Sequence, residues 1–172
     1  YPTDFKHADG RPAAVYSSAN KKTISRHFRW MRDYGIDGIF LQRFANELHS
    51  ARLKAQKDVV LFHVRDAALE TGRVFAVMYD LSGLRKGQVA SAGNDWKQLM
   101  HDGITKGSRY LHHNGKPLVA VWGVGFRDNR EYTLAECGEL IDVLKSEGCA
   151  VMLGVPSWWR EQKRDAVSDK KL

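Results

Sequence analysis

The sequence predicts an α/β protein with a parallel sheet, organised as a (β/α) barrel of about five βα units. Five short apolar runs lack any alternation of polar and apolar residues, which is typical of strands buried on both faces. Segments with helical periodicity separate these runs, and such an order with short turns favours parallel strands joined by right-handed crossovers. An eight-stranded barrel requires about 250 residues, so 172 residues with five units are expected to form an incomplete TIM barrel.

The expected strands are the apolar runs themselves, and glycines mark where the preceding helices end. The runs occupy residues 12–18, 37–43, 73–80, 116–122 and 149–155. Gly35, Gly72 and Gly148 each come between a helical segment and a strand, where a left-handed cap residue is expected. These glycines therefore mark the amino ends of the second, third and fifth strands.

Four helical segments fit between the strands. Three apolar residues share one face of the first segment, namely Ile24, Phe28 and Met31. The second and third segments are expected over residues 56–71 and 95–106, and Gly103 interrupts the third. Thr133 and Glu136 have the spacing of a capping box, so the fourth helix is expected to begin there.

A five-stranded doubly wound α/β domain is the alternative, because it closes within the same length. The barrel is favoured by the polar and aromatic residues that follow every predicted strand, where barrel enzymes build their sites. The sequence contains no GxGxxG motif after a strand and no Walker loop. We expect one (β/α) domain over residues 1–172, as a fragment of a longer catalytic barrel; a non-catalytic ligand- or protein-binding domain is the alternative function.

Composition argues against several other classes of protein. The 27 Lys and Arg residues against 20 Asp and Glu give a net charge of +7, but the basic residues are scattered, so no nucleic acid is expected as a partner. No apolar run approaches the roughly 18–20 residues of a membrane span. Cys137 and Cys149 lack CxxC spacing, and His112 and His113 have no partner pair, so we expect neither a metal nor another cofactor.

Asp80 is the candidate catalytic residue. It ends an apolar strand and precedes Leu81, Ser82 and Gly83, which places its carboxylate at the barrel mouth. Glycosidic hydrolysis generally uses two carboxyl groups, and Asp80 is the one that the strand ends supply. The alternative is that Asp80 caps a turn, as Asp commonly does before Ser-Gly.

The other candidates are polar or aromatic residues at strand ends, all assigned to substrate binding. Arg43, next to Gln42, has a fork of donors suited to sugar hydroxyls or a carboxylate; its alternative role is a salt bridge to Asp80 or Glu47. Indole rings stack on the apolar face of a pyranose, although aromatic residues also fill cores. The substrate-binding candidates are Gln42, Arg43, Tyr79, Trp122, Trp158 and Trp159. The segment Gly123-Val124-Gly125 is expected to be a loop whose backbone closely approaches a ligand or another segment.

Five segments resemble one family in order and spacing: HADGRPAAVYSS, HFRWMRDYGIDGIFLQRF, ALETGRVFAVMYDLSGL, GKPLVAVWGVGF and VMLGVPSWWRE. Over residues 5–160 the chain is similar to (β/α)8 glycoside hydrolases related to families 99 and 71, the endo-α-mannosidase and α-1,3-glucanase type, with bacterial relatives described as xylosidase- or arabinosidase-like. The resemblance implies an oligosaccharide or polysaccharide substrate and secretion or a periplasmic location.

The chain departs from that family at the residues that carry catalysis. Tyr79 and Asp80 stand near the positions of a family histidine and glutamate without matching them. The family's Glu-Trp-x-Glu segment, which holds the catalytic pair, is absent from these residues. Glycosidase activity would thus depend on carboxylates from a longer chain. An incomplete barrel would leave the strands at both sheet edges unpaired, so we also expect the chain to self-associate.

Overall fold

Four parallel strands form the centre of the sheet in the computed structural model, which describes residues 2–167. They are β3 (Gly38–Phe44), β4 (Val74–Asp80), β6 (Lys116–Trp122) and β7 (Ala150–Gly154). Each strand pairs in parallel with the next one along the chain, in the order β3-β4-β6-β7. The short β5 (His112–His113) pairs antiparallel with the start of β6, so the sheet is mixed and the fold is α/β.

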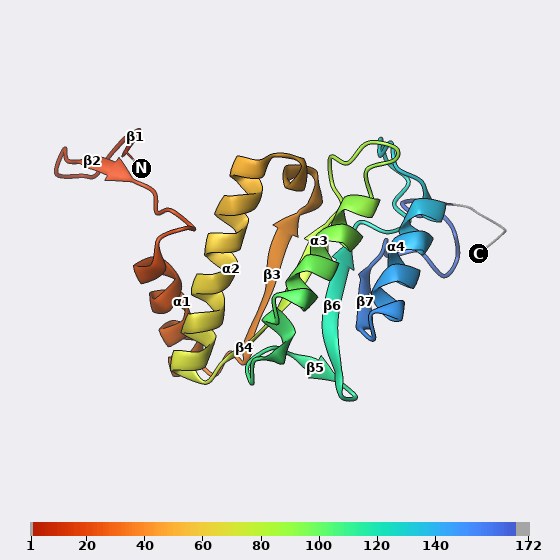
Figure 1. Cartoon of the computed structure of the whole chain (residues 1–172). Helices are drawn as coiled ribbons and strands as arrows, with labels where there is room; N and C mark the ends of the chain where they lie inside the picture. Colours follow the sequence, from red (N-terminus) through yellow and green to blue (C-terminus); the bar gives the residue numbers. More distant parts are fainter. Residues whose placement is uncertain (1, 168–172) are drawn as a thin grey trace.

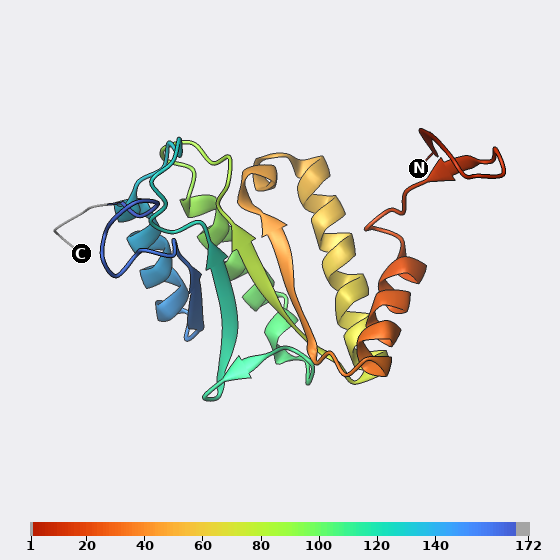
Figure 2. The ribbon, with the colours of Figure 1, turned by 180° about the vertical axis from the view of Figure 1, so that it is seen from behind.

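All four helices lie on one face of this sheet. They are α1 (Lys21–Asp33), α2 (Ala51–Thr71), α3 (Ala90–His101) and α4 (Leu134–Ser146). Helices α2, α3 and α4 stand in front of the strands in Figure 1 and behind them after a half turn in Figure 2, and α1 lies beside α2 beyond β3. A doubly wound domain has helices on both faces and a reversal in strand order. The doubly wound alternative is therefore wrong for the described residues.

The first predicted strand, residues 12–18, is not part of the sheet. Only β2 (Pro12–Ala14) forms there, and it pairs antiparallel with β1 (Pro2–Lys6) in a separate hairpin that stands apart from the sheet (Figure 1). Gly10 adopts a left-handed φ of 81° in the connecting turn. A partner a few residues upstream pairs without any crossover, so the local hairpin forms instead of a sheet strand. The sheet thus contains four of the five expected parallel strands.

The predicted cap of α2 and the predicted start of α4 are confirmed, while α2 begins earlier than expected and α3 both begins and ends earlier. Gly72 is the left-handed cap of α2, and Thr133 and Glu136 form the capping box of α4. Helix α2 begins before residue 56 because the Ser50 hydroxyl accepts a hydrogen bond from the Leu53 amide. Gly103, with φ of 76°, ends α3, and the short 3-10 helix η2 (Ile104–Lys106) follows it; a second one, η1 (Ala45–His49), follows β3.

The two faces of the sheet have different surroundings. Side chains alternate along each strand, and one set packs under the helices, for example Phe75 and Val77 beside Trp96 in the core. The other set forms a surface that no described helix covers, which we call the open face. The strand residues of the open face are Gly38, Phe40, Gln42, Phe44, Val74, Ala76, Met78, Asp80, Leu118, Ala120, Trp122, Ala150, Met152 and Gly154. No helix of the described part is long and apolar enough to span a bilayer.

Candidate functional site

Asp80 lies at the carboxyl end of β4, where the sequence placed it, and it is held by two neutral donors. The Gln42 side-chain amide donates to its Oδ2 at 2.6 Å, and the Ser82 backbone N–H donates to its Oδ1 at 2.8 Å. The second bond confirms the turn-capping role. The first bond joins two residues of the open face from adjacent strands. Asp80, which is only 4% exposed, therefore caps the turn, and its carboxylate is fixed at the rim of the open face.

Trp122 is the direct sheet neighbour of Asp80 on β6. Its ring lies against the backbone of Gly154 on β7, so closely that a Cβ atom there would be 2.2 Å from the ring. The Phe126 ring is 5.5 Å away, and the Arg130 guanidinium lies 4.6 Å from the centre of that ring. Trp122 remains 42% exposed. Its ring is thus a supported and accessible surface beside the carboxylate.

The loop after β6 is held by its own side chains. The Tyr132 hydroxyl donates to the Gly123 carbonyl at 2.7 Å, and Arg130 donates to the same carbonyl at 3.3 Å. Gly123 has a φ of 107°, and a Cβ atom there would be 2.5 Å from Arg130. The close approach expected for this glycine segment is therefore confirmed, and its partners are protein side chains. Burial raises the pKa of Tyr132 even though Arg130 opposes the shift, so its hydroxyl stays protonated and donates.

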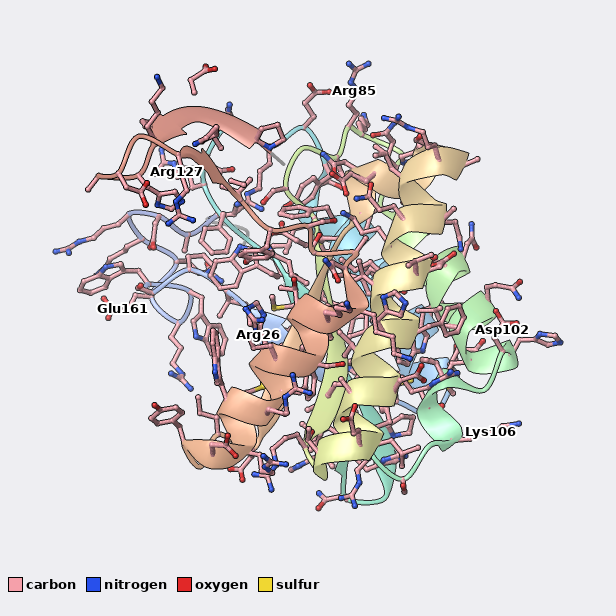
Figure 3. The ribbon with its side chains drawn as sticks, turned by 90° about the vertical axis from the view of Figure 1, so that its left-hand side faces the viewer. Arg26, Arg85, Asp102, Lys106, Arg127 and Glu161 are labelled. Atoms are coloured by element: carbon pink, nitrogen blue, oxygen red, sulfur yellow. The ribbon has the colours of Figure 1, made fainter. Side chains whose placement is uncertain are left out.

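A polar hollow of about 390 Å³ lies between this loop and the turn after Asp80. Its lining comes from residues 82–85 and 128–131. Arg85 stands at this end of the molecule, and Lys106 projects at the opposite end (Figure 3). The hollow therefore belongs to the carboxyl-end rim, on the same side as Asp80 and Trp122.

Arg43 is not at this rim, which corrects the sequence-based assignment. Its side chain is only 2% exposed and lies on the helix-covered face. It donates to both oxygens of Asp95 on α3, at 2.7 and 2.8 Å, and to Asp58 on α2 at 2.6 Å. The expected alternative, a salt bridge from Arg43 to Asp80 or Glu47, is also wrong. Asp80 accepts from Gln42 and Ser82 on the other face, and Glu47 pairs with Lys57.

Tyr79 belongs to the same buried cluster as Arg43. Its hydroxyl donates to Asp95 at 2.7 Å. Complete burial, followed by the neighbouring Asp95 charge, raises the pKa of Tyr79 well above its ordinary value, so the phenol stays neutral. We call Arg43, Tyr79, Asp95, Asp58 and Lys54 the buried ion network, since Lys54 completes it by pairing with Asp58 at 2.8 Å. This network ties the sheet to α2 and α3 and does not reach the open face.

Trp158 and Trp159 follow β7 in a turn. Trp159 borders an apolar groove with Leu153 and Leu134, on the side of α4. Arginines of the same segment cover both rings: Arg164 lies 3.9 Å from the centre of the Trp158 ring, and Arg160 lies 4.7 Å from that of Trp159. Within residues 2–167, no hydrogen bond or ring contact joins either indole to Asp80, Gln42 or Trp122.

The structure therefore brings together three of the seven predicted site residues: Gln42, Asp80 and Trp122. Asp80 is the single acidic residue among the strand positions of the open face. No group of three or more His, Cys, Asp or Glu side chains in the described part is arranged to hold a metal ion. The arrangement places one largely buried carboxylate and one amide beside one accessible indole at a common edge. An indole of this kind offers an apolar stacking surface next to polar groups.

The stability of the buried ion network is expected to depend on pH through Asp58. Burial raises the pKa of Asp58, but hydrogen bonds from Lys54 and Arg43 outweigh it and hold the pKa below its ordinary value. A group whose pKa is lower in the folded state contributes stability above its unfolded pKa, about 4, and loses it as the pH falls through the folded value. Urea titrations of the wild-type chain and Asp58→Asn should show their difference in unfolding free energy shrink below about pH 4; a constant difference would contradict this.

The fold is α/β, and Gln42, Asp80 and Trp122 lie together at the carboxyl ends of its parallel strands. No family model and no curated protein matches the chain. Among similar solved structures are two of the GH99 endo-alpha-mannosidase from Bacteroides thetaiotaomicron, one of them in complex with bis-tris-propane. Each is 14% identical with a TM-score of 0.46 over 62% of this chain. The chain spans 29% and 30% of those structures, and a similarity of this extent assigns it neither family nor activity.

Proposed function

We propose that this chain is a carbohydrate-active, glycoside hydrolase-like protein of the (β/α)-barrel type. It binds an oligosaccharide at the carboxyl ends of its strands. The observation that carries the proposal is the accessible Trp122 ring directly beside the Asp80 carboxylate on the open face. The one-sided arrangement of the helices supports the barrel type, because a barrel carries all its helices outside the sheet.

Trp122 and Asp80 match the two kinds of surface that a sugar presents. The apolar face of a pyranose stacks on an indole ring, and its hydroxyl groups donate to carboxylate oxygens. Phe126 supports the Trp122 ring, so the ring keeps its position before a ligand arrives. A ligand surface that is already in place loses less entropy on binding. Gln42 fixes the Asp80 carboxylate in the same way.

Asp80 is the proposed catalytic carboxylate, and it does not suffice for hydrolysis. Glycosidic cleavage generally uses two carboxyl groups about 5–9.5 Å apart. The open-face strand positions supply one. We therefore propose that these residues form part of a larger catalytic barrel, and that the strands which complete it bring the second carboxylate to the mouth.

The test is a calorimetric titration of the 172-residue chain with α-linked manno-oligosaccharides and, separately, α-1,3-gluco-oligosaccharides, the classes that the sequence resemblance implies. Trp122→Ala is expected to weaken binding about tenfold, because one stacking contact contributes about 0.5–1.5 kcal/mol. Trp30→Ala is the matched control, since Trp30 is 52% exposed on α1, and it should bind like the wild type. Equal binding by both variants, or no binding by the wild-type chain, would contradict the proposal.

A further inference from the structure

The described sheet has half the parallel strands, and the described residues half the helices, of an eight-stranded barrel. Strands β3, β4, β6 and β7 are parallel and adjacent in chain order, with four helices on one face (Figure 2). In a barrel of eight parallel strands, helices cover the outside and side chains of the inner face fill the centre. The open face occupies the position of that inner face. Two such sheets therefore supply the eight strands and eight helices of one barrel.

Both edges of the sheet are unpaired among the described residues. Strand β3 pairs only with β4, and β7 pairs only with β6. Proteins protect edge strands with lysine, proline or bulges, and β7, which reads AVMLG, has none of these. An unprotected edge of this kind is a template for another strand. The free edges of β3 and β7 lie at opposite sides of the sheet, so each is free to meet a neighbour.

The open face exposes large apolar side chains besides Trp122. Phe40, Phe44 and Met152 are between 36% and 42% exposed. Large side chains bury roughly 150–250 Å² each, so these three leave on the order of 200 Å² exposed per copy. Two copies facing each other remove about 400 Å² through these side chains alone, a third of the roughly 1,200 Å² of a specific interface. Pairing of the two edges and packing of the flanking helices add to that area.

The described residues leave an apolar groove beside β7. It measures about 690 Å³ and is lined by Leu134, Leu153 and Val155 and by the segment after β7 up to Val167. In a barrel, the helix before a strand packs over the seam between that strand and the previous one. The helix before β3 is α1, which lies at the other side of the sheet from β7 (Figure 1). The α1 of a second copy therefore falls over this groove when its β3 pairs with β7.

We propose that two copies of the 172-residue chain close into one eight-stranded barrel around a twofold axis. Strand β3 of each copy pairs in parallel with β7 of its partner, and the two open faces form a common interior. The two seams are identical by symmetry, so the assembly ends at two copies. This inference stands on topology and does not depend on the proposed saccharide. A monomer that binds saccharide would contradict the proposed dimer and leave the proposed function standing. A dimer that binds no saccharide would contradict the proposed function and leave the dimer standing.

Sedimentation equilibrium of the 172-residue chain tests the closure. The expected species is a discrete dimer of about 39 kDa, twice the 19.5 kDa of one chain. Hydrogen exchange should show slow backbone amides at the outer edges of both β3 and β7 at concentrations where the dimer forms. A 19.5 kDa monomer, an open-ended series of larger species, or protection of one edge alone would overturn the proposal.

Two lysine variants, one on the open face and one on a helix, form a matched pair for testing the dimer. Met152→Lys should weaken the dimer at least about a hundredfold, because closure would bury an unpaired ammonium group. Val59→Lys introduces the same charge at an exposed position of α2, away from both seams, and should leave the dimer unchanged. Circular dichroism establishes that both variants are folded, and the exchange pattern of the wild-type chain tests the closure without either variant. Equal dimer affinity of the two variants would contradict the proposal.

Discussion

Arg43→Met is expected to lower the free energy of unfolding by about 3–5 kcal/mol, the typical cost of removing one partner from a buried ion pair. Arg43 supplies both hydrogen bonds that neutralise Asp95, which is itself buried between the sheet and α3. The methionine fills a similar volume but leaves the Asp95 carboxylate with the neutral Tyr79 hydroxyl and the more distant Lys54, at 3.5 Å. The loss therefore comes from an uncompensated charge and not from a cavity.

Urea denaturation followed by circular dichroism measures this effect. Arg26→Met is the matched control, because Arg26 projects from the surface of α1 (Figure 3) and its replacement should change stability little. Arg43→Lys should recover only part of the loss, since an ammonium group does not reproduce the two-oxygen contact of the guanidinium. A loss below about 1 kcal/mol in Arg43→Met would contradict the assignment of Arg43 to a structural network.

Gly38→Ala is expected to destabilise the chain by about 1–3 kcal/mol or more, because β3 and β4 approach too closely for a side chain at this position. A Cβ atom on Gly38 would lie 1.9 Å from the Val74 carbonyl oxygen, and the two residues are partners at the amino ends of these strands. A backbone carbonyl group cannot rotate out of the way as the end of a flexible side chain can. The two strands must therefore separate locally to admit the methyl group.

The control for this prediction has the opposite expected sign. Gly138 lies within α4, and a Cβ atom there would meet nothing within 4 Å. Gly138→Ala should thus stabilise the chain by about 0.5–1 kcal/mol through helix propensity. Thermal unfolding of both variants checks the pair. If Gly38→Ala were neutral, the close approach of β3 and β4 would be contradicted.

The parallel strands were predictable because each is a short, nearly continuous apolar run between segments with helical periodicity. The hairpin at residues 2–14 was not predictable from that pattern, because it forms by local pairing and buries little apolar surface. Its sequence reads like a sheet strand, and only the competing partner upstream distinguishes it. The one-sided placement of the helices depends on how successive units stack, and the periodicity of single segments does not carry that information.

The site was predicted in part, and the errors have one physical cause. Gln42 and Arg43 are consecutive, as are Tyr79 and Asp80, and consecutive strand residues point to opposite faces. Assigning all four to one surface ignored this alternation. The acidic partners of Arg43, Asp58 and Asp95, were not predicted because both lie on helices and the candidate residues were all taken from strand ends. Phe126 and Arg130 were missed because they act through the ring of Trp122 and the Gly123 carbonyl, contacts that only the folded loop creates.

The most direct test of a saccharide surface on the open face is to follow the indole N–H resonances by heteronuclear NMR while α-linked manno- and gluco-oligosaccharides are added. The resonance of Trp122 should shift in a saturable way. That of Trp96, which is buried and donates to the Cys149 sulfur, should stay in place. Saturable binding that leaves the Trp122 resonance unmoved, or no saturable change with either saccharide, would contradict the account.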